Sequence, residues 1–257
     1  MSDYAHIRIE VGDDRIATVW LDRPPVNAFN QQMYRDLKAA FEEVGAREDV
    51  NIVVLATAGR HFCGGNDLDE FKTLSPENSP ERMLEVIDAF RAIYDCPVPV
   101  LAALRGVAFG AGAGIVGSCD FTVAAHGAKL GLPEIGVGVM GGARHLARLV
   151  PQAYMRVMFF TGEPAAVEEL ERFGGIIEIV DPDELMDRAR HHALLVARHS
   201  PVAIRTAKRA LNESEFMDLF PGYEAEQRYT GELSGHPDSK EALNAFLERR
   251  PPRYAGA

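Results

Sequence analysis

Two glycine-rich segments, residues 61–68 and 105–114, constrain the fold of this chain more than any other feature. Each follows a short, continuous apolar run (52–56 and 98–104), which is typical of a strand buried on both faces. Each also precedes a helical pattern of apolar residues. A strand that turns directly into a helix leaves backbone N–H groups free at the start of that helix. The sequence therefore predicts an α/β fold with two such turns.

The first part of the chain alternates strand and helix patterns. Alternating apolar residues over 7–11 and 16–21 predict a β-hairpin. Asn30 is placed to cap the helix that follows, and Asp67 is placed to cap a short helix that ends at Phe71. These signals fix where the helices start on either side of the first glycine-rich segment.

Helical patterns dominate after Gly141, and only residues 176–180 resemble a strand there. We expect an α/β core over residues 1–197 and a C-terminal helical region over 198–257. The helices predicted after Gly141 cover residues 144–160, 163–173, 182–197, 201–213, 221–233 and 237–248.

The composition argues against several classes of protein. A net charge of −11 disfavours nucleic acid or an anionic membrane as the main partner. Cys63, Cys96 and Cys119 lie far apart and lack metal-binding spacing, so we expect reduced thiols and no metal. The longest apolar stretch, 98–104, is too short to span a bilayer, and no signal peptide pattern opens the sequence. We therefore expect a cytoplasmic protein.

Glu134 is the carboxylate best placed for chemistry, because it follows Pro133 within an apolar, glycine-rich stretch (132–142). Two backbone N–H groups directed at one oxygen would form an oxyanion hole, and a carboxylate beside them could move a proton. A lone Glu is more often a surface residue, and glycine loops are often only tight turns. The spaced pair of loops followed by Glu134 favours a site, and apolar surroundings predict a raised pKa for Glu134.

Five segments carry a family resemblance by their order and spacing. They are Arg-Pro-Pro-Val-Asn-Ala-Phe-Asn (23–30), Phe-Cys-Gly-Gly-Asn-Asp-Leu (62–68), the loop and helix at 106–120, Leu-Pro-Glu (132–134) and Phe-Leu-Glu-Arg-Arg-Pro (246–251). Together they resemble the crotonase superfamily, which includes enoyl-CoA hydratases and isomerases. The resemblance implies a spiral of repeated β-β-α units with a C-terminal helical region for trimerisation or as a lid. It also implies a homotrimer or dimer of trimers.

The resemblance further implies an acyl-CoA thioester substrate, with coenzyme A as part of the substrate and no separate cofactor. The N–H groups of Asn66 and Ala111 would hold the thioester oxygen, and Glu134 would act as acid and base. Asn66 stands where the family usually has Ala or Gly. The residues that the resemblance places at the ligand are Arg23, Ala28, Gly64, Asn66, Asp67, Leu68, Gly110, Ala111 and Arg250, with Arg249 and Lys208 as further candidates for phosphate contacts.

Gly114 is the main departure from that pattern, because hydratases carry a second Glu there, twenty positions before the Pro-Glu carboxylate. A single carboxylate suits a double-bond isomerase, which removes a proton from C2 of a 3-enoyl-CoA and returns it at C4. An acyl-CoA hydrolase or decarboxylase with Asn66 or His145 as a helper is an alternative. A non-catalytic acyl-CoA-binding protein is another. The metabolic context, fatty-acid or other acyl-CoA metabolism, stays open.

By the same resemblance, residues 75–80 and the helix predicted over 81–94 shape the acyl pocket. Four apolar residues recur on that helix at a spacing that core packing would also produce. They are Met83, Ile87, Phe90 and Tyr94.

Overall fold

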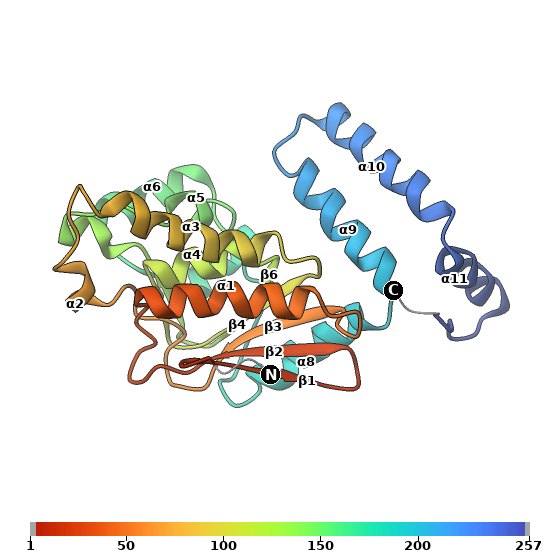
Figure 1. Cartoon of the computed structure of the whole chain (residues 1–257), viewed down its shortest axis with the longest axis horizontal. Coiled ribbons are helices and arrows are strands. Elements are labelled where there is room, and N and C mark those ends of the chain that lie inside the picture. Colours follow the sequence, from red (N-terminus) through yellow and green to blue (C-terminus); the bar gives the residue numbers. More distant parts are fainter. Residues whose placement is uncertain (1–3, 255–257) are drawn as a thin grey trace.

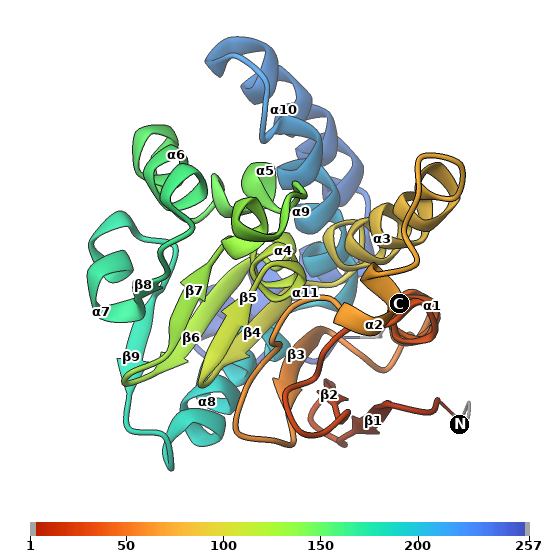
Figure 2. The ribbon, with the colours of Figure 1, turned by 90° about the vertical axis from the view of Figure 1, so that its left-hand side faces the viewer.

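The computed structural model describes residues 4–254 and contains two β-sheets with helices on both sides (Figures 1 and 2). The larger sheet has the order β1-β2-β3-β4-β6-β9, and the smaller has the order β5-β7-β8. In the larger sheet only β1 and β2 pair antiparallel. The strands are β1 (Ile7–Val11), β2 (Ile16–Leu21), β3 (Ile52–Thr57), β4 (Val100–Leu104), β5 (Val107–Phe109), β6 (Phe121–Ala125), β7 (Lys129–Gly131), β8 (Ala165–Ala166) and β9 (Glu178–Val180).

The central strands are buried on both faces, as their continuous apolar runs predict. On β3, Val53 and Leu55 join one core cluster, whereas Ile52 and Val54 join the other. Alternate side chains of a strand point to opposite faces, which explains this division. The first face is covered by helices α1 (Gln31–Gly45), α3 (Ser79–Tyr94) and α4 (Ala111–Ser118), and the second by α8 (Leu185–Ala197).

The predicted hairpin and helix starts are confirmed. β1 and β2 pair from Ile7 opposite Leu21 onward. The Asn30 side chain accepts the N–H of Met33 at the start of α1. Asp67 accepts N–H groups at the start of the short helix α2 (Leu68–Phe71).

The prediction of one helix over 144–160 is wrong. Two helices, α5 (Ala143–Leu146) and α6 (Gln152–Thr161), replace it, with Pro151 between them. Proline cannot donate a backbone hydrogen bond and disfavours helix in the residue before it. The helix predicted over 163–173 also divides, into β8, α7 (Val167–Leu170) and a short 3₁₀ helix, η2 (Glu171–Phe173).

The last three helices, α9 (Pro201–Ser214), α10 (Leu219–Ser234) and α11 (Pro237–Glu248), lie beside the α/β core at one end of the molecule (Figure 1). The Asn51 amide donates to the carbonyls of Ala197 and His199, which fixes the chain where α8 gives way to α9. Lys208 of α9 is buried and pairs with Asp120 at 2.6 Å. We propose residue 197 as the boundary between core and helical region. Along residues 4–254, no helix combines the length and the apolar character needed to cross a bilayer.

Candidate active site

The two glycine-rich segments run side by side and bring two free N–H groups together. Cys63 donates its N–H to the Val107 carbonyl at 2.9 Å, and Phe109 donates to the Cys63 carbonyl at 2.9 Å. Ala111 is the first residue of α4, so its N–H has no acceptor within the helix. Among residues 4–254, no hydrogen-bond acceptor is recorded for the N–H of Ala111 or of Asn66. The structure therefore leaves available both donors that the sequence predicted.

Glu134 lies in a 3₁₀ helix, η1 (Pro133–Val137), with its carboxylate against the turn that starts α4. A Cβ atom at Gly110 would collide with Oε1 of Glu134, and Gly110 has a φ of +53°. Glycine is thus needed here both for its backbone conformation and for the room it leaves. Glu134 is only 8% exposed, and its Oε2 has no hydrogen-bond partner among the described residues. Burial raises the pKa of Glu134, in the predicted direction.

An aromatic ring fills the space at Gly114, where the resemblance predicts a second carboxylate in hydratases. A Cβ atom at Gly114 would lie 2.8 Å from Cζ of Phe90, which projects from α3 and is 6% exposed. The Phe90 ring meets the His145 ring edge-on, with centroids 5.1 Å apart, and lies 6.3 Å from the Tyr34 ring. Burial, with Arg148 and then Arg144 nearby, lowers the pKa of His145. Phe90 therefore stands as an apolar wall where hydratases are expected to have their second Glu.

Four of the predicted ligand residues, Arg23, Ala28, Gly64 and Asp67, form one cluster where the chain at 23–28 meets the first glycine-rich segment. Arg23 pairs with the Asp67 carboxylate at 2.6 Å and also donates to the Ala28 carbonyl. This hydrogen bond from Arg23 lowers the pKa of Asp67. Gly64 donates to the Val26 carbonyl at 2.7 Å and so joins the same cluster. Arg23 thus holds Asp67, the residue directly after Asn66.

Arg250 and Lys208 do not join this cluster. Arg250 pairs with Glu241 and Glu248 just after α11, and α11 lies at the opposite end of the molecule from α2 (Figure 1). Lys208 is buried against Asp120, which leaves it poorly placed to contact a phosphate. Within one chain, the structure separates Arg250 from the other predicted ligand residues.

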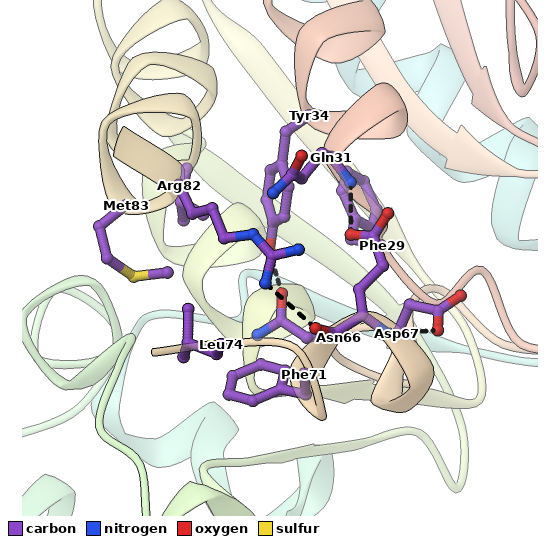
Figure 3. A pocket seen from close by; sticks show the side chains of 11 residues that line it. Phe29, Gln31, Tyr34, Asn66, Asp67, Phe71, Leu74, Arg82 and Met83 are labelled. Atoms are coloured by element: carbon purple, nitrogen blue, oxygen red, sulfur yellow. Dashed lines mark hydrogen bonds between the residues drawn. The ribbon is translucent and has the colours of Figure 1, made fainter. Parts of the chain in front are cut away.

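A small pocket of about 40 Å³ opens beside Asn66 (Figure 3). Tyr34 donates its hydroxyl to Oδ1 of Asn66 at 2.5 Å. Burial raises the pKa of Tyr34 well above its usual value, so its hydroxyl stays protonated. The lining residues are Phe29, Gln31, Tyr34, Asn66, Asp67, Glu70, Phe71, Leu74, Arg82, Met83 and Val86.

Sequence reasoning missed Tyr34 and Arg82, because both lie among helical residues that resemble ordinary core or surface positions. Of the four apolar residues on the helix expected to shape the acyl pocket, Met83 lines the pocket beside Asn66. In contrast, Tyr94 bonds to Glu215 and Ile87 is exposed. The described residues include no cluster of His, Cys, Asp and Glu side chains that could hold a metal ion.

Comparison with known proteins shows the family to which the sequence belongs. The sequence model described as enoyl-CoA hydratase/isomerase matches residues 12–257. A (7aS)-7a-methyl-1,5-dioxo-2,3,5,6,7,7a-hexahydro-1H-indene-carboxyl-CoA hydrolase from Rhodococcus jostii is 38% identical over 241 residues, 93% of each chain. The hydrolase of the same description from Mycobacterium tuberculosis is also 38% identical, over 91% of this chain and 95% of its own. A short-chain-enoyl-CoA hydratase from Clostridium acetobutylicum is 30% identical over 93% of each chain.

Solved structures agree with the fold. The enoyl-CoA hydratase of Mycobacterium smegmatis superposes with a TM-score of 0.92 at 27% identity, covering 96% of this chain and 98% of its own. The enoyl-CoA hydratase of Bacillus anthracis gives a TM-score of 0.92 at 26% identity, covering 98% of this chain and all of its own. The predicted crotonase-like fold, with its C-terminal helical region, is thereby confirmed. The chain belongs to the enoyl-CoA hydratase/isomerase family of the crotonase superfamily.

Proposed function

We propose that this protein is an acyl-CoA enzyme that stabilises a thioester enolate with the N–H groups of Asn66 and Ala111 and moves protons with Glu134. One observation carries the proposal. The Phe90 ring packs on Gly114, so the position of a second hydratase carboxylate is apolar, whereas Glu134 remains beside the start of α4. The site supports chemistry that needs a single acid/base group.

In the proposed mechanism, the thioester oxygen accepts both N–H groups while Glu134 removes a proton from C2. The electron pair of the broken C–H bond moves onto the thioester oxygen as an enolate. One such donor is typically worth about 3–4 kcal/mol of the barrier. The raised pKa of Glu134 makes its carboxylate a stronger base and its protonated form available to return the proton.

Double-bond isomerisation needs the fewest groups at this site, since one acid/base residue and the two N–H donors suffice. Glu134 would return the proton to C4 of the dienolate, which converts a 3-enoyl-CoA to a 2-enoyl-CoA without water. No group at position 114 is needed to hold a nucleophile. This reaction is our first candidate.

Acyl-CoA hydrolysis is the second candidate, because the two relatives at 38% identity are named as hydrolases. Glu134 would take a proton from water as the water oxygen adds to the thioester carbonyl carbon. The C–S bond would then break, and Glu134 would give that proton to the sulfur of the departing coenzyme A. The same N–H groups would stabilise the oxyanion formed by this addition.

The deciding experiment supplies short 2-enoyl-CoA, 3-enoyl-CoA and saturated acyl-CoA thioesters and follows the products by chromatography. Interconversion of the two enoyl forms without 3-hydroxyacyl-CoA supports isomerisation. Release of free coenzyme A supports hydrolysis. Rapid formation of 3-hydroxyacyl-CoA contradicts the single-carboxylate proposal. Binding without any product, unchanged in Glu134→Gln, would point to a non-catalytic binding protein.

We also propose assembly as a homotrimer or dimer of trimers. Leu219 and Phe220 on α10 are 79% and 74% exposed, and Leu211 and Phe216 nearby are also exposed. Such a concentration of large apolar side chains suits a contact with another copy. Assembly would also give Arg250 a route to the ligand of a neighbouring copy. We expect Phe220→Ser to lower the mass measured by light scattering, and an unchanged mass would contradict this contact.

We further propose a cytoplasmic location. Cys63, Cys96 and Cys119 are all unpaired and buried, which suits a reducing compartment.

A further inference from the structure

The pocket beside Asn66 has an apolar wall and a polar wall, and the polar wall includes two side chains that donate hydrogen bonds, Asn66 and Arg82. Oδ1 of Asn66 accepts the hydrogen bond from the Tyr34 hydroxyl, so the amide NH₂ is the part of the Asn66 side chain that remains able to donate. Figure 3 shows this nitrogen pointing toward Leu74 and Phe71, into the pocket. Asn66 therefore offers a side-chain donor close to its own backbone N–H.

Arg82 adds a positive charge to the same wall. From α3 it reaches over the pocket toward Asn66 (Figure 3) and donates to the Glu70 carbonyl at 3.1 Å and to the Thr73 hydroxyl at 2.9 Å. The side-chain amide of Gln31 also lies within hydrogen-bond distance of its guanidinium. All three partners are neutral. Over residues 4–254, Arg82 forms no ion pair, although the protein carries a net charge of −11.

A plain alkyl chain in this pocket would cover the Asn66 amide and the Arg82 guanidinium without accepting hydrogen bonds from them. A polar group that loses water without gaining a partner costs about 1–3 kcal/mol, and more if it is charged. An acyl group with its own oxygen acceptor would avoid that cost. The pocket also contains the Glu70 carboxylate, whose Oε2 accepts the N–H of Gln31 at 2.9 Å. Glu70 would repel an anionic acyl group, so a neutral acceptor fits best.

We propose that this pocket selects acyl groups that carry a ketone oxygen, which accepts hydrogen bonds from the side chains of Asn66 and Arg82. The inference rests on the proposed function, which places the thioester oxygen at the backbone N–H of the same Asn66. Because one residue contacts both oxygens, the ketone and the thioester lie only a few bonds apart or fold toward each other. Tyr34 is then a positioning residue, since its hydroxyl orients the Asn66 amide.

The test compares the dissociation constants of 5-oxohexanoyl-CoA and hexanoyl-CoA, measured by calorimetry with the intact protein. We expect the oxo compound to bind about 10- to 100-fold more tightly, the range for a hydrogen bond to a charged donor. Arg82→Met is expected to reduce this ratio to below about 3, with hexanoyl-CoA affected least. Arg91→Met, an exposed cation on the same helix, is the matched control and should keep the wild-type ratio.

Two further variants test the second donor, Asn66, and the residue that orients it, Tyr34. Asn66→Ala keeps the backbone N–H and should lower the ratio, and Tyr34→Phe should lower it less.

Equal binding of the two thioesters by the wild type would overturn the inference while leaving the proposed function intact. Equal weakening of both by Arg82→Met would overturn it too. Tighter binding of glutaryl-CoA than of 5-oxohexanoyl-CoA would overturn the preference for a ketone and show that the pocket selects a carboxylate. Failure of both thioesters to bind would overturn the inference and the proposed function together.

Discussion

Gly110 and Gly114, one helical turn apart at the start of α4, each make room for a different side chain. Gly110 leaves space for the Glu134 carboxylate, and Gly114 leaves space for the Phe90 ring. The first glycine lets the proposed acid/base group lie against the turn that starts α4. The second lets an apolar ring seal the position from which another acid would project. The same residue type thus admits a charge at one site and excludes a charge at the other.

Replacing the carboxylate tests the Gly110 side most directly. We expect Glu134→Gln to lower kcat by about 10²- to 10⁴-fold, the usual contribution of a general acid or base, with acyl-CoA binding retained. Glu163→Gln, at an exposed position, should leave kcat unchanged. Steady-state rates and calorimetric binding together check this expectation. Wild-type turnover by Glu134→Gln would assign the proton transfer to another group.

Removing the ring tests the Gly114 side. Phe90→Ala is expected to lower the free energy of unfolding by about 3–5 kcal/mol, because it leaves a cavity in the core. Phe160→Ala, where the ring is 66% exposed, should change that free energy by less than about 0.5 kcal/mol. Urea denaturation measures both.

The same variant allows a sharper comparison. With the ring gone, the double variant Phe90→Ala/Gly114→Glu has space for a second carboxylate. We expect it to gain measurable hydration of a 2-enoyl-CoA, whereas Gly114→Glu alone should be destabilised by the clash with Phe90. Strong hydratase activity in the wild type would remove the distinction between the two glycines.

Filling the space at Gly110 should damage activity, and the φ of +53° there means that an alanine should also lower the free energy of unfolding. A methyl group there meets the Glu134 carboxylate, and a displacement of about 1 Å can cost about 10²-fold in rate. We therefore expect Gly110→Ala to lower kcat by roughly that factor. At Gly136 a Cβ atom meets nothing within 4 Å, so Gly136→Ala is the control. Equal rates in the two variants would contradict the close approach.

The smallest predicted effect is on the pH dependence of stability. Burial raises the pKa of Glu134 above its ordinary value of 4.5. Between the two values the native state binds more protons than the unfolded state, so the free energy of unfolding falls as pH rises through this window. Glu134→Gln should remove this fall. If Glu134 is the base, the acidic limb of kcat/KM should also lie above pH 4.5. A limb at or below that value would contradict the raised pKa.

The parts of the site that were predictable depend on local chain chemistry. Glycine turns, the caps by Asn30 and Asp67, and the position of Glu134 after Pro133 are all visible as short patterns. Phe90 could be seen only as one of four apolar helical residues. Its contact with Gly114 depends on how α3 packs on α4. The sequence around Gly114 does not indicate which side chain fills the space beside it.

The errors also have physical causes. The helix predicted over 144–160 ignored Pro151, which the sequence shows plainly. The assignment of Arg250 to the ligand stays a prediction, because within one chain Arg250 follows α11, at the opposite end of the molecule from α2. Arg82 has no distinguishing sequence pattern. Its interest comes from lacking an ion-pair partner in the described part of the chain, which is a property of three-dimensional packing.

The backbone link between Cys63 and the strand around Ala108 has a consequence for how this protein can diverge. The two N–H groups are held by main-chain pairing between the glycine segments, so substitutions that preserve the fold leave them in place. New reactions can therefore arise by exchanging side chains around a constant pair of donors. Around the proposed oxyanion hole, a paired exchange at positions 90 and 114, which contact each other, could change the reaction while the two donors stay in place.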